Sequence, residues 1–219
     1  MLDEALNKKC FQEVINRGIP VEGKFSLAAF VVHAVGVTAS AYGHITDPAN
    51  WMWICLFLAV ITGIDDNLDG EQEIEHMYRF NERFLNYQPQ GNPALASLDE
   101  LLREVPHHYK NPIVANLITT SVLDYITSII LDHETKDMQV LYCPNPCSLY
   151  LRRSLPQIST QPVHYAKYWR VLSGFPNLLV LMMFPSTLPI CEYIQSVPEL
   201  GLITSYVKYV SFIYFFPGS

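Results

Sequence analysis

The sequence predicts an all-α protein, and three observations point to that class. Apolar residues recur at helical spacing in several long stretches, no alternating pattern of useful strand length occurs, and Pro or Gly interrupts the chain at intervals that suit helices. The 219 residues, 50% of them hydrophobic, are enough to bury a sizeable core. We therefore expect one helical domain over residues 1–219, with its least regular stretch between residues 137 and 162.

The first two helices are expected near the N-terminus. Leu2, Leu6, Cys10 and Val14 recur every four residues, which is the spacing of one apolar helix face. Residues 26–42 are rich in small side chains and are apolar nearly all round. A helix of that composition is expected in the interior, because it has no face that favours solvent.

Two further helices are expected to start at an Asx-Pro pair. At residues 47–48 the pair is Asp-Pro and at residues 111–112 it is Asn-Pro, so a capping side chain precedes a proline. The missing N–H of that proline costs nothing in the first turn of a helix. From these starts the apolar pattern predicts helices over residues 48–64 and 112–129.

A shorter helix is expected to follow a capping box. Ser97 and Glu100 have the spacing in which each side chain caps a backbone N–H of the other, so this helix should start at Ser97. Pro106 should end it. Further helices are expected to start near Pro162 and to cover residues 198–210.

The net charge argues against a general nucleic-acid binder. The chain carries 14 Lys and Arg against 21 Asp and Glu, a net charge of -7. Binding to nucleic acid needs a basic surface that displaces counterions from phosphates. A phosphate-bearing substrate would have to be held locally, by metal ions or by a few arginines.

Cysteine usage and the apolar runs indicate a cytoplasmic protein. The five cysteines are scattered, which is unlike a disulfide framework, and Cys143 and Cys147 lack the second pair that a zinc site needs. No signal-peptide pattern begins the sequence. The longest apolar run, residues 51–64, is shorter than the roughly 20 residues of a bilayer crossing, so we expect a buried helix there and no membrane segment.

Three aspartates follow the most hydrophobic of the expected helices. Asp65 and Asp69 lie four residues apart, so their carboxylates share one face if the helix continues, with Asp66 beside them. Carboxylates at a helix C-terminus face the negative end of the helix dipole, which is destabilising unless a cation compensates. Hard oxygen ligands without neighbouring Cys or His favour Mg²⁺. The pattern predicts a magnesium site; the alternative is a helix end whose acidic residues are simply solvated.

A second candidate segment contains Arg170 and Gly174. Gly174 and Pro176 interrupt an otherwise helical, apolar stretch, and Pro176 is expected to break the helix because it removes a hydrogen bond and crowds the preceding turn. Arg170, one turn before that break, could pair with two oxygens of a diphosphate. Taken alone, the segment would favour a surface arginine at a helix bend.

These residues together resemble a known family, the class I terpene synthases. The sequence D-D-N-L-D at residues 65–69 is similar to the aspartate-rich first metal motif of that family. Tyr168, Arg170 and Gly174 match the Y-x-R-x-x-x-G element of its fungal trichodiene synthase-like branch. Two later segments also resemble that branch, residues 183–185 and 198–210. The likeness therefore covers most of the chain.

The resemblance implies the α-helical bundle of isoprenoid synthases and a cyclisation reaction. A prenyl diphosphate, most often farnesyl diphosphate in this family, would be ionised with Mg²⁺ and its carbocation cyclised to a sesquiterpene. Asp65 would coordinate magnesium, with Asp66 and Asp69 as neighbours. Arg170 would bind the diphosphate, and Gly174 would mark the break that moves with it. The expected partner is that substrate, with neither nucleic acid nor membrane; a homodimer is left open.

One departure from the family concerns the end of the sequence. The family carries a second metal motif, [N/D]-D-x-x-S-x-x-x-E, and residues 198–210 look like its lead-in. Residues 211–216 instead read S-F-I-Y-F-F. We therefore expect an incomplete terpene synthase domain whose C-terminal helices are missing. Such a chain should bind Mg²⁺ and diphosphate weakly and turn over little substrate.

Two functions of other classes are kept as alternatives. Glu73 with His76, and Glu104 with His107, have the Glu-x-x-His spacing of di-iron carboxylate bundles, although Pro106 is expected to end the helix between the second pair. The other alternative is an inactive homologue that acts as a helical binding or interaction protein. In that case the acidic cluster is only a solvated helix end.

Overall fold

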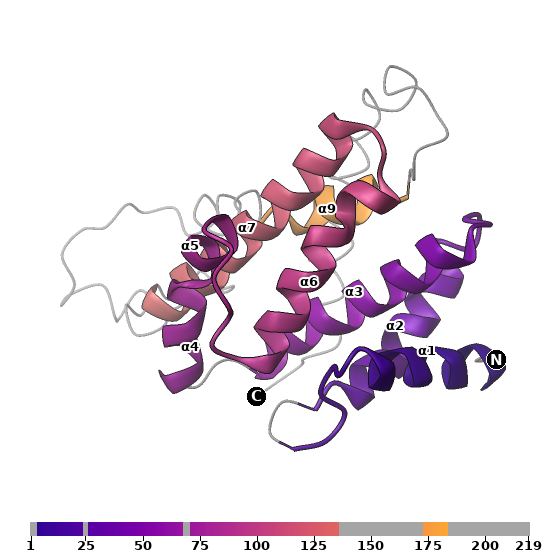
Figure 1. The fold of residues 1–219 in the computed structure, drawn as a ribbon, viewed down its shortest axis with the longest axis horizontal. Coiled ribbons are helices and arrows are strands. Elements are labelled where there is room, and N and C mark those ends of the chain that lie inside the picture. Colours follow the sequence, from indigo (N-terminus) through magenta and orange to yellow (C-terminus); the bar gives the residue numbers. More distant parts are fainter. Residues whose placement is uncertain (1–3, 24–25, 68–70, 136–172, 184–219) are drawn as a thin grey trace, which may run out of the picture.

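The computed structural model describes residues 4–23, 26–67, 71–135 and 173–183, and every regular element within these ranges is a helix (Figure 1). This confirms the predicted all-α class. In chain order the helices are α1 (Glu4–Asn16), α2 (Ala28–Ala41), α3 (Pro48–Asn67), α4 (Glu71–Tyr78), α5 (Phe80–Leu85), α6 (Pro93–His108), α7 (Pro112–Thr135) and α9 (Phe175–Leu181). The helices expected near Pro162 and over residues 198–210, and the stretch between residues 137 and 162, lie outside the described residues.

Helix α3 is at the centre of the described part of the chain. Helices α2 and α6 pack against it, and α1 lies against both α2 and α3. Residues 53–61 are all buried. Because both sides of α3 are covered by other helices, its sequence is apolar on every face. The expected buried helix is therefore confirmed, although it is longer, at 20 residues, than the apolar run that predicted it.

Helices Pro48–Asp66 and Pro112–Glu134 have the length and composition of a membrane-crossing helix. Core helices of soluble proteins share both properties, so this is weak support for a membrane segment. In α3 the packing of α2 and α6 accounts for the apolar composition.

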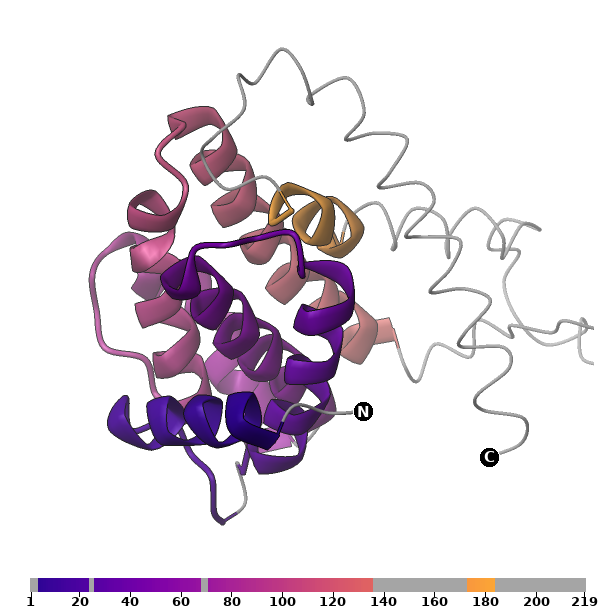
Figure 2. The same ribbon diagram turned by 90° about the vertical axis from the view of Figure 1, so that its right-hand side faces the viewer.

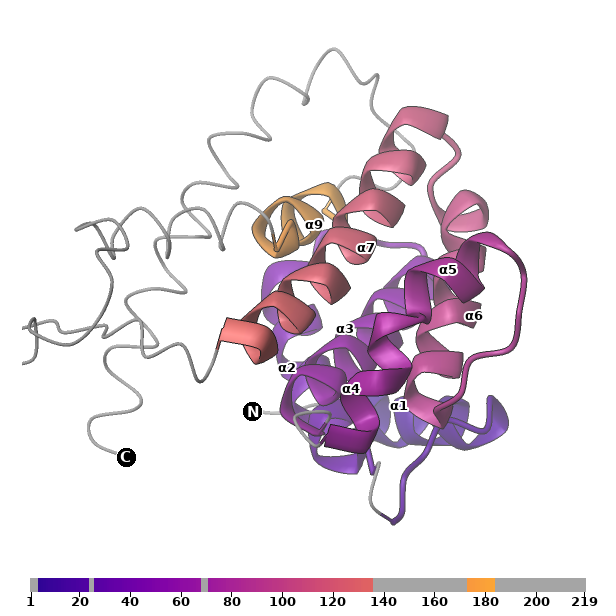
Figure 3. The ribbon, with the colours of Figure 1, turned by 90° about the vertical axis from the view of Figure 1, so that its left-hand side faces the viewer.

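Helix α7 supports the second half of the fold. It packs against α6, α4, α5 and α9, and Figures 2 and 3 show α9 on one side of α7 with α4 and α5 on the other. Asn81 Nδ2 donates to the carbonyl of Leu123 at 3.3 Å and to Thr127 Oγ1 at 3.2 Å. The Tyr78 hydroxyl donates to the carboxylate of Glu134. These contacts hold α4 and α5 to α7.

Two of the predicted helix starts are confirmed by their caps. Asp47 Oδ1 accepts a hydrogen bond from the N–H of Ala49 at 3.2 Å at the start of α3. Asn111 Oδ1 accepts one from the N–H of Ile113 at 3.0 Å at the start of α7. In both helices the Asx side chain satisfies a backbone donor that has no partner within the helix.

The predicted start of α6 was wrong. The helix begins one turn earlier, where Asn92 Oδ1 accepts from the N–H of Ala94 at 2.8 Å and of Leu95 at 3.3 Å. Ser97 lies inside the helix, and its hydroxyl donates to the carbonyl of Pro93 at 2.9 Å. The Asn92-Pro93 pair is thus a third Asx-Pro start, and it takes the place of the expected capping box.

Pro106 does not end α6 either. The helix continues to His108, and the N–H of Tyr109 bonds to the carbonyl of Val105 at 2.8 Å. A proline this close to the end of a helix removes one hydrogen bond but leaves little helix beyond it to distort. The end of α6 therefore lies at His108.

Candidate functional site

The acidic motif lies at the C-terminal end of α3, which continues through Asp65 and Asp66 to Asn67. Both aspartates are exposed, whereas Ile64 directly before them is fully buried. The helix therefore passes from core to solvent within one residue. Asp69 lies outside the described residues, so its place on the same face as Asp65 stays a prediction.

Gly63 fixes this end of α3 against the start of α2. A Cβ on Gly63 would lie 2.1 Å from Leu27 Cδ2 and 3.2 Å from Phe30 Cδ2. Because Leu27 is fully buried, its side chain has no solvent to turn into. The missing side chain thus allows the two helices to approach closely just before Asp65, which holds the acidic end of α3 in place.

Tyr125 of α7 connects this acidic end with the interior. It is only 4% exposed, and its phenol lies close enough to the Asp65 carboxylate for the two to interact electrostatically. Burial above all, and then the negative charges of Asp65 and Asp66, raise the pKa of the Tyr125 phenol well above its ordinary value. The phenol therefore keeps its proton and stays neutral beside Asp65.

Gly174 is the N-cap residue of α9, and the helix that it was predicted to interrupt lies outside the described residues. Its φ of +59° is in the left-handed region that glycine adopts without strain, and a Cβ there would lie 2.8 Å from the carbonyl oxygen of Ser121. The next residue, Phe175, stacks on the ring of Tyr125 with 5.2 Å between centroids. Helix α7 therefore contacts the break through Ser121 and the acidic end of α3 through Tyr125, one helical turn later.

That Pro176 breaks a preceding helix stays a prediction, because the residues before Ser173 lie outside the described part of the chain. Pro176 lies in the first turn of α9, where its missing N–H is not needed for a bond within the helix. Gly174, with its positive φ, is the residue at which the chain direction changes. Arg170 lies outside the described residues, so its role as a diphosphate ligand stays a prediction.

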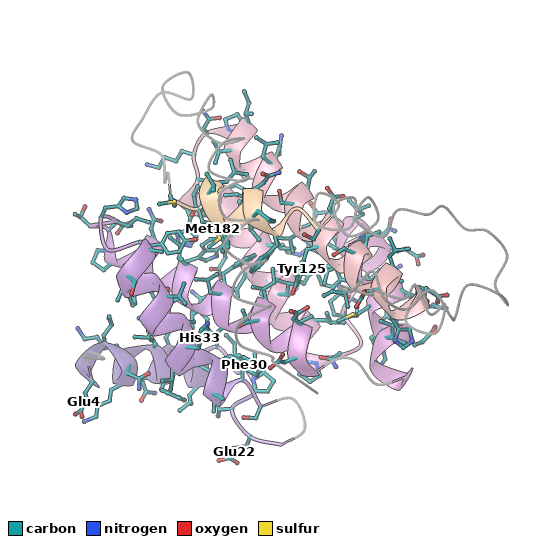
Figure 4. All side chains as sticks on the ribbon, turned by 180° about the vertical axis from the view of Figure 1, so that it is seen from behind. Glu4, Glu22, Phe30, His33, Tyr125 and Met182 are labelled. Carbon is teal, nitrogen blue, oxygen red and sulfur yellow. The ribbon has the colours of Figure 1, made fainter. Side chains whose placement is uncertain are left out.

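Two buried tyrosines hold the other end of α9. The Tyr42 hydroxyl donates to the carbonyl of Leu179 at 2.8 Å, and the Tyr109 hydroxyl donates to the carbonyl of Met182 at 3.0 Å. Burial raises the pKa of both phenols. Figure 4 shows Met182 at this end of α9 and Tyr125 beside its start. Both anchoring tyrosines directly follow a helix, α2 or α6, and nothing in the sequence separates them from surface tyrosines.

The exposed carboxylates are suited to a divalent cation. Within the described residues, neither Asp65 nor Asp66 forms an ion pair with Lys, Arg or His. Both lie at the negative end of the α3 dipole, where a cation relieves an unfavourable charge arrangement. Mg²⁺ keeps several waters and takes one or two carboxylates from a protein, so these oxygen donors fit it. In the described part of the chain, no group of three or more His, Cys, Asp or Glu is arranged to hold a metal.

The Glu-x-x-His pair of α6 belongs to an ion-pair network. Arg17 Nη1 lies 2.7 and 2.9 Å from the two carboxylate oxygens of Glu104, and His108 Nε2 lies 3.8 Å from one of them. His107 is exposed. The argument that Pro106 separates this pair by ending the helix was wrong, but Glu104 is engaged with Arg17. This disfavours the di-iron alternative, because its carboxylate holds α6 to the end of α1.

Comparisons with known proteins bear on the identity of the chain. No protein-family model matches it. It is 30% identical to alpha-cuprenene synthase COP6 of Coprinopsis cinerea over 199 residues, which cover 90% of this chain and 55% of that protein. It is 25% identical to terpene synthase BipA of Cochliobolus sativus over 210 residues, which cover 94% of this chain and 57% of that protein.

The homologues of this chain are thus fungal terpene synthases at modest identity. The chain spans a little over half the length of these relatives. The comparisons support the terpene synthase family that the acidic motif predicted. They do not show that the chain belongs to the narrower, trichodiene synthase-like branch that the sequence predicted.

Proposed function

We propose that the chain is part of a terpene cyclase, in which the acidic end of α3 takes part in the Mg²⁺-dependent ionisation and cyclisation of a prenyl diphosphate. The observation that carries the proposal is the turn of α7 from Ser121 to Tyr125. Ser121 lies against Gly174, the Tyr125 ring stacks on Phe175, and Asp65 is near enough to raise the pKa of Tyr125, so one helix lies beside both motifs that the sequence resemblance singled out. The fungal terpene synthase homologues support the same function.

Each motif residue has a physical role in this proposal. Asp65, with Asp66 and Asp69 beside it, holds Mg²⁺ through carboxylate oxygens. When bound, the ion stabilises the negative charge of the departing diphosphate. Arg170 binds diphosphate oxygens through its planar guanidinium group. The left-handed conformation of Gly174 permits the chain to turn into α9 at the point where it approaches Ser121.

The narrower parts of the proposal come from the sequence resemblance. They are the trichodiene synthase-like branch, farnesyl diphosphate as substrate, a sesquiterpene as product and a cytoplasmic location. The 219 residues contain one acidic metal motif of the two that the resembled family uses. We therefore propose that the chain on its own forms an incomplete domain with weak affinity for Mg²⁺ and diphosphate and with little turnover. Measurable cyclisation of farnesyl diphosphate by the purified 219-residue chain would contradict the low turnover.

Ligand-dependent thermal unfolding tests the function itself. A ligand that binds the folded state raises the melting temperature, so MgCl₂ with inorganic diphosphate should stabilise the wild-type chain. Asp65→Asn should abolish that increase, and Asp66→Asn should reduce it. Glu100→Gln is the matched control, because Glu100 is also exposed but lies on α6. Equal increases in all four proteins would rule out the proposed metal site.

The same experiment separates the enzyme from a helical interaction protein. The exposure of Asp65 and Asp66 is the observation that favours this second candidate. If they form only a solvated helix end, Asp65→Asn relieves repulsion with the helix dipole, and the ligand-free melting temperature stays constant or rises slightly. In that case MgCl₂ with diphosphate would have no effect on the wild-type chain.

A further inference from the structure

Two buried cysteines from distant parts of the chain meet in the core. Cys10 of α1 and Cys55 of α3 are 45 residues apart in the sequence, yet their sulfurs share a hydrogen bond at 3.5 Å. Both side chains are completely buried, and both are free thiols. The two sulfurs of a disulfide lie about 2.0 Å apart, so a further approach of about 1.5 Å, shared between two side chains, would join this pair.

The helices that carry the two cysteines differ in how much of their surface is buried. Cys55 belongs to the continuous buried stretch of α3, residues 53–61, at the centre of the described fold. Among the side chains of α1 that the structure describes, only those of Cys10 and Val14 are buried. A helix with so few buried side chains detaches locally at a smaller cost than a central helix does. Local opening of α1 therefore gives a small oxidant access to Cys10.

The hydrogen bond between the sulfurs makes the two thiols chemically unequal. It lowers the pKa of Cys10, because a neighbouring S–H stabilises a thiolate there, and this outweighs the opposing effect of burial. The same bond, together with burial, raises the pKa of Cys55, so that thiol keeps its proton. The thiolate is the form that attacks an oxidant. Cys10 is therefore suited to react first, and Cys55 is placed to react with the product.

We propose that Cys10 and Cys55 form a modification site at which hydrogen peroxide converts the two thiols into a disulfide. The Cys10 thiolate attacks one peroxide oxygen, the O–O bond breaks, and the departing hydroxide takes up a proton to form water, which leaves Cys10 as a sulfenic acid. The Cys55 thiol then attacks the sulfur of Cys10 and releases a second water. In total two S–H bonds and one O–O bond break, one S–S bond and two O–H bonds form, and two electrons pass from sulfur to the peroxide.

The disulfide ties α1 to the middle of α3. It closes a loop between residues 10 and 55, which restricts the unfolded chain and opposes the detachment of α1. In a cytoplasmic location such a pair stays as thiols until an oxidant is present, and thiol reductants reverse the bond afterwards. The site is therefore a reversible covalent link on α1, and it does not depend on the acidic end of α3.

Thiol counting tests whether the link forms. Cys143, Cys147 and Cys191 lie outside the described residues, so they are replaced by Ser in the full-length chain to leave Cys10 and Cys55 alone. After treatment with hydrogen peroxide and denaturation, this monomer should take up no N-ethylmaleimide, and dithiothreitol should restore both reactive thiols. A peptide map should contain the Cys10 and Cys55 peptides joined to each other. Two thiols that stay reduced under peroxide, or that oxidise without becoming linked, would overturn the proposal, because buried structural thiols are inert.

Two single variants of that protein test the order of the reaction. Cys55→Ala should stop at the sulfenic acid of Cys10, which dimedone traps, because no second thiol is left to displace it. Cys10→Ala should leave Cys55 unlabelled, because its buried thiol keeps its proton. Dimedone on Cys55 and none on Cys10 would contradict the assigned roles.

Hydrogen exchange tests the effect on α1. Oxidation should slow amide exchange in the peptide covering residues 4–16 by about 3-fold or more, and dithiothreitol should reverse the change. Cys55→Ala treated in the same way is the matched control, and its exchange should not slow. Equal exchange in the oxidised and reduced proteins would show that the disulfide does not hold α1. Since none of these experiments uses Mg²⁺ or diphosphate, their failure would leave the proposed function standing.

Discussion

The two ends of α9 are held in different ways. At its C-terminal end, the phenols of Tyr42 and Tyr109 bond directly to backbone carbonyls of the segment. At its N-terminal end, the contacts are a close approach of Gly174 to Ser121 and the ring stack of Phe175 on Tyr125, whose pKa the nearby Asp65 raises. The C-terminal end of α9 is therefore held by hydrogen bonds to the rest of the fold, whereas its start is held by packing next to a residue of the proposed metal site.

This difference indicates how a binding event at an exposed helix end can reach the interior. A hydrogen bond to a buried backbone carbonyl contributes to stability, because losing it leaves a polar group without a partner. A ring stack and a close backbone approach leave no polar group without a partner when they loosen, so the start of α9 is better placed to respond to a ligand. The following predictions separate the two roles.

The largest effect is expected at the close approach beside α9. Gly174→Ala forces an L-residue into the left-handed region, which costs about 1–2 kcal/mol, and brings a Cβ against Ser121, which adds about 1–3 kcal/mol. Gly18→Ala is the control, because Gly18 has a similar φ of +68° but no atom within 4 Å of the Cβ position. Urea unfolding followed by circular dichroism should show a greater loss for Gly174→Ala. Equal losses of unfolding free energy in the two variants would mean that the backbone of Ser121 shifts to accommodate the new Cβ without an energetic penalty.

The tyrosines at the C-terminal end of α9 should make the free energy of unfolding sensitive to alkaline pH. Burial raises the pKa of Tyr42 and Tyr109, so above about pH 10 the unfolded chain releases protons that the folded chain keeps. Below pH 10 these two tyrosines should not make the free energy of unfolding depend on pH. Above it, the free energy should fall by about 1.4 kcal/mol per pH unit for each tyrosine. Urea unfolding between pH 8 and about 11 measures this slope. The double variant Tyr42→Phe/Tyr109→Phe should remove the share of these two groups and leave that of Tyr125, whose pKa is also raised; an unchanged slope would contradict the assignment.

The tyrosines of the two ends should differ in their contribution to stability at neutral pH. Tyr109→Phe leaves the buried Met182 carbonyl without its donor and should cost about 1–3 kcal/mol in unfolding free energy. Tyr125→Phe leaves the exposed Asp65 carboxylate, which water can solvate, and should cost less than about 1 kcal/mol. Chemical denaturation of both variants makes the comparison. A larger loss for Tyr125→Phe would show that both ends are held in the same way.

The smallest effect is expected at His44. Its Nε2 bonds to the carbonyl of Met183 at 2.8 Å, just beyond the C-terminal end of α9, but the side chain is exposed. His44→Ala should therefore change the unfolding free energy by no more than about 0.5 kcal/mol. A loss comparable to that of Tyr109→Phe would place His44 among the anchors of α9, and urea unfolding distinguishes the two outcomes.

The features predicted correctly from the sequence are mostly local. Asp47 and Asn111 cap helices through neighbouring backbone groups, so the residues beside them are enough to identify the start. The same signal at Asn92 was missed because Ser97 offered a competing local pattern inside the helix. The end of α3 at the acidic motif was predicted because its apolar pattern changes abruptly after residue 64.

The features missed depend on tertiary packing. Tyr125 lies near Asp65 only because of the tertiary arrangement of α7 and α3, and no sequence pattern encodes that arrangement. Tyr42 and Tyr109 meet α9 from positions more than 70 residues away in the chain, by 137 and 73 residues.

The most direct test of the central claim is to locate the metal ion. Crystals of the chain grown with Mn²⁺ in place of Mg²⁺, together with inorganic diphosphate, would give an anomalous difference map that marks the ion. The account predicts a peak within about 2.0–2.5 Å of a carboxylate oxygen of Asp65. A bound ion elsewhere in the molecule, with Asp65 and Asp66 free in solvent, would contradict it.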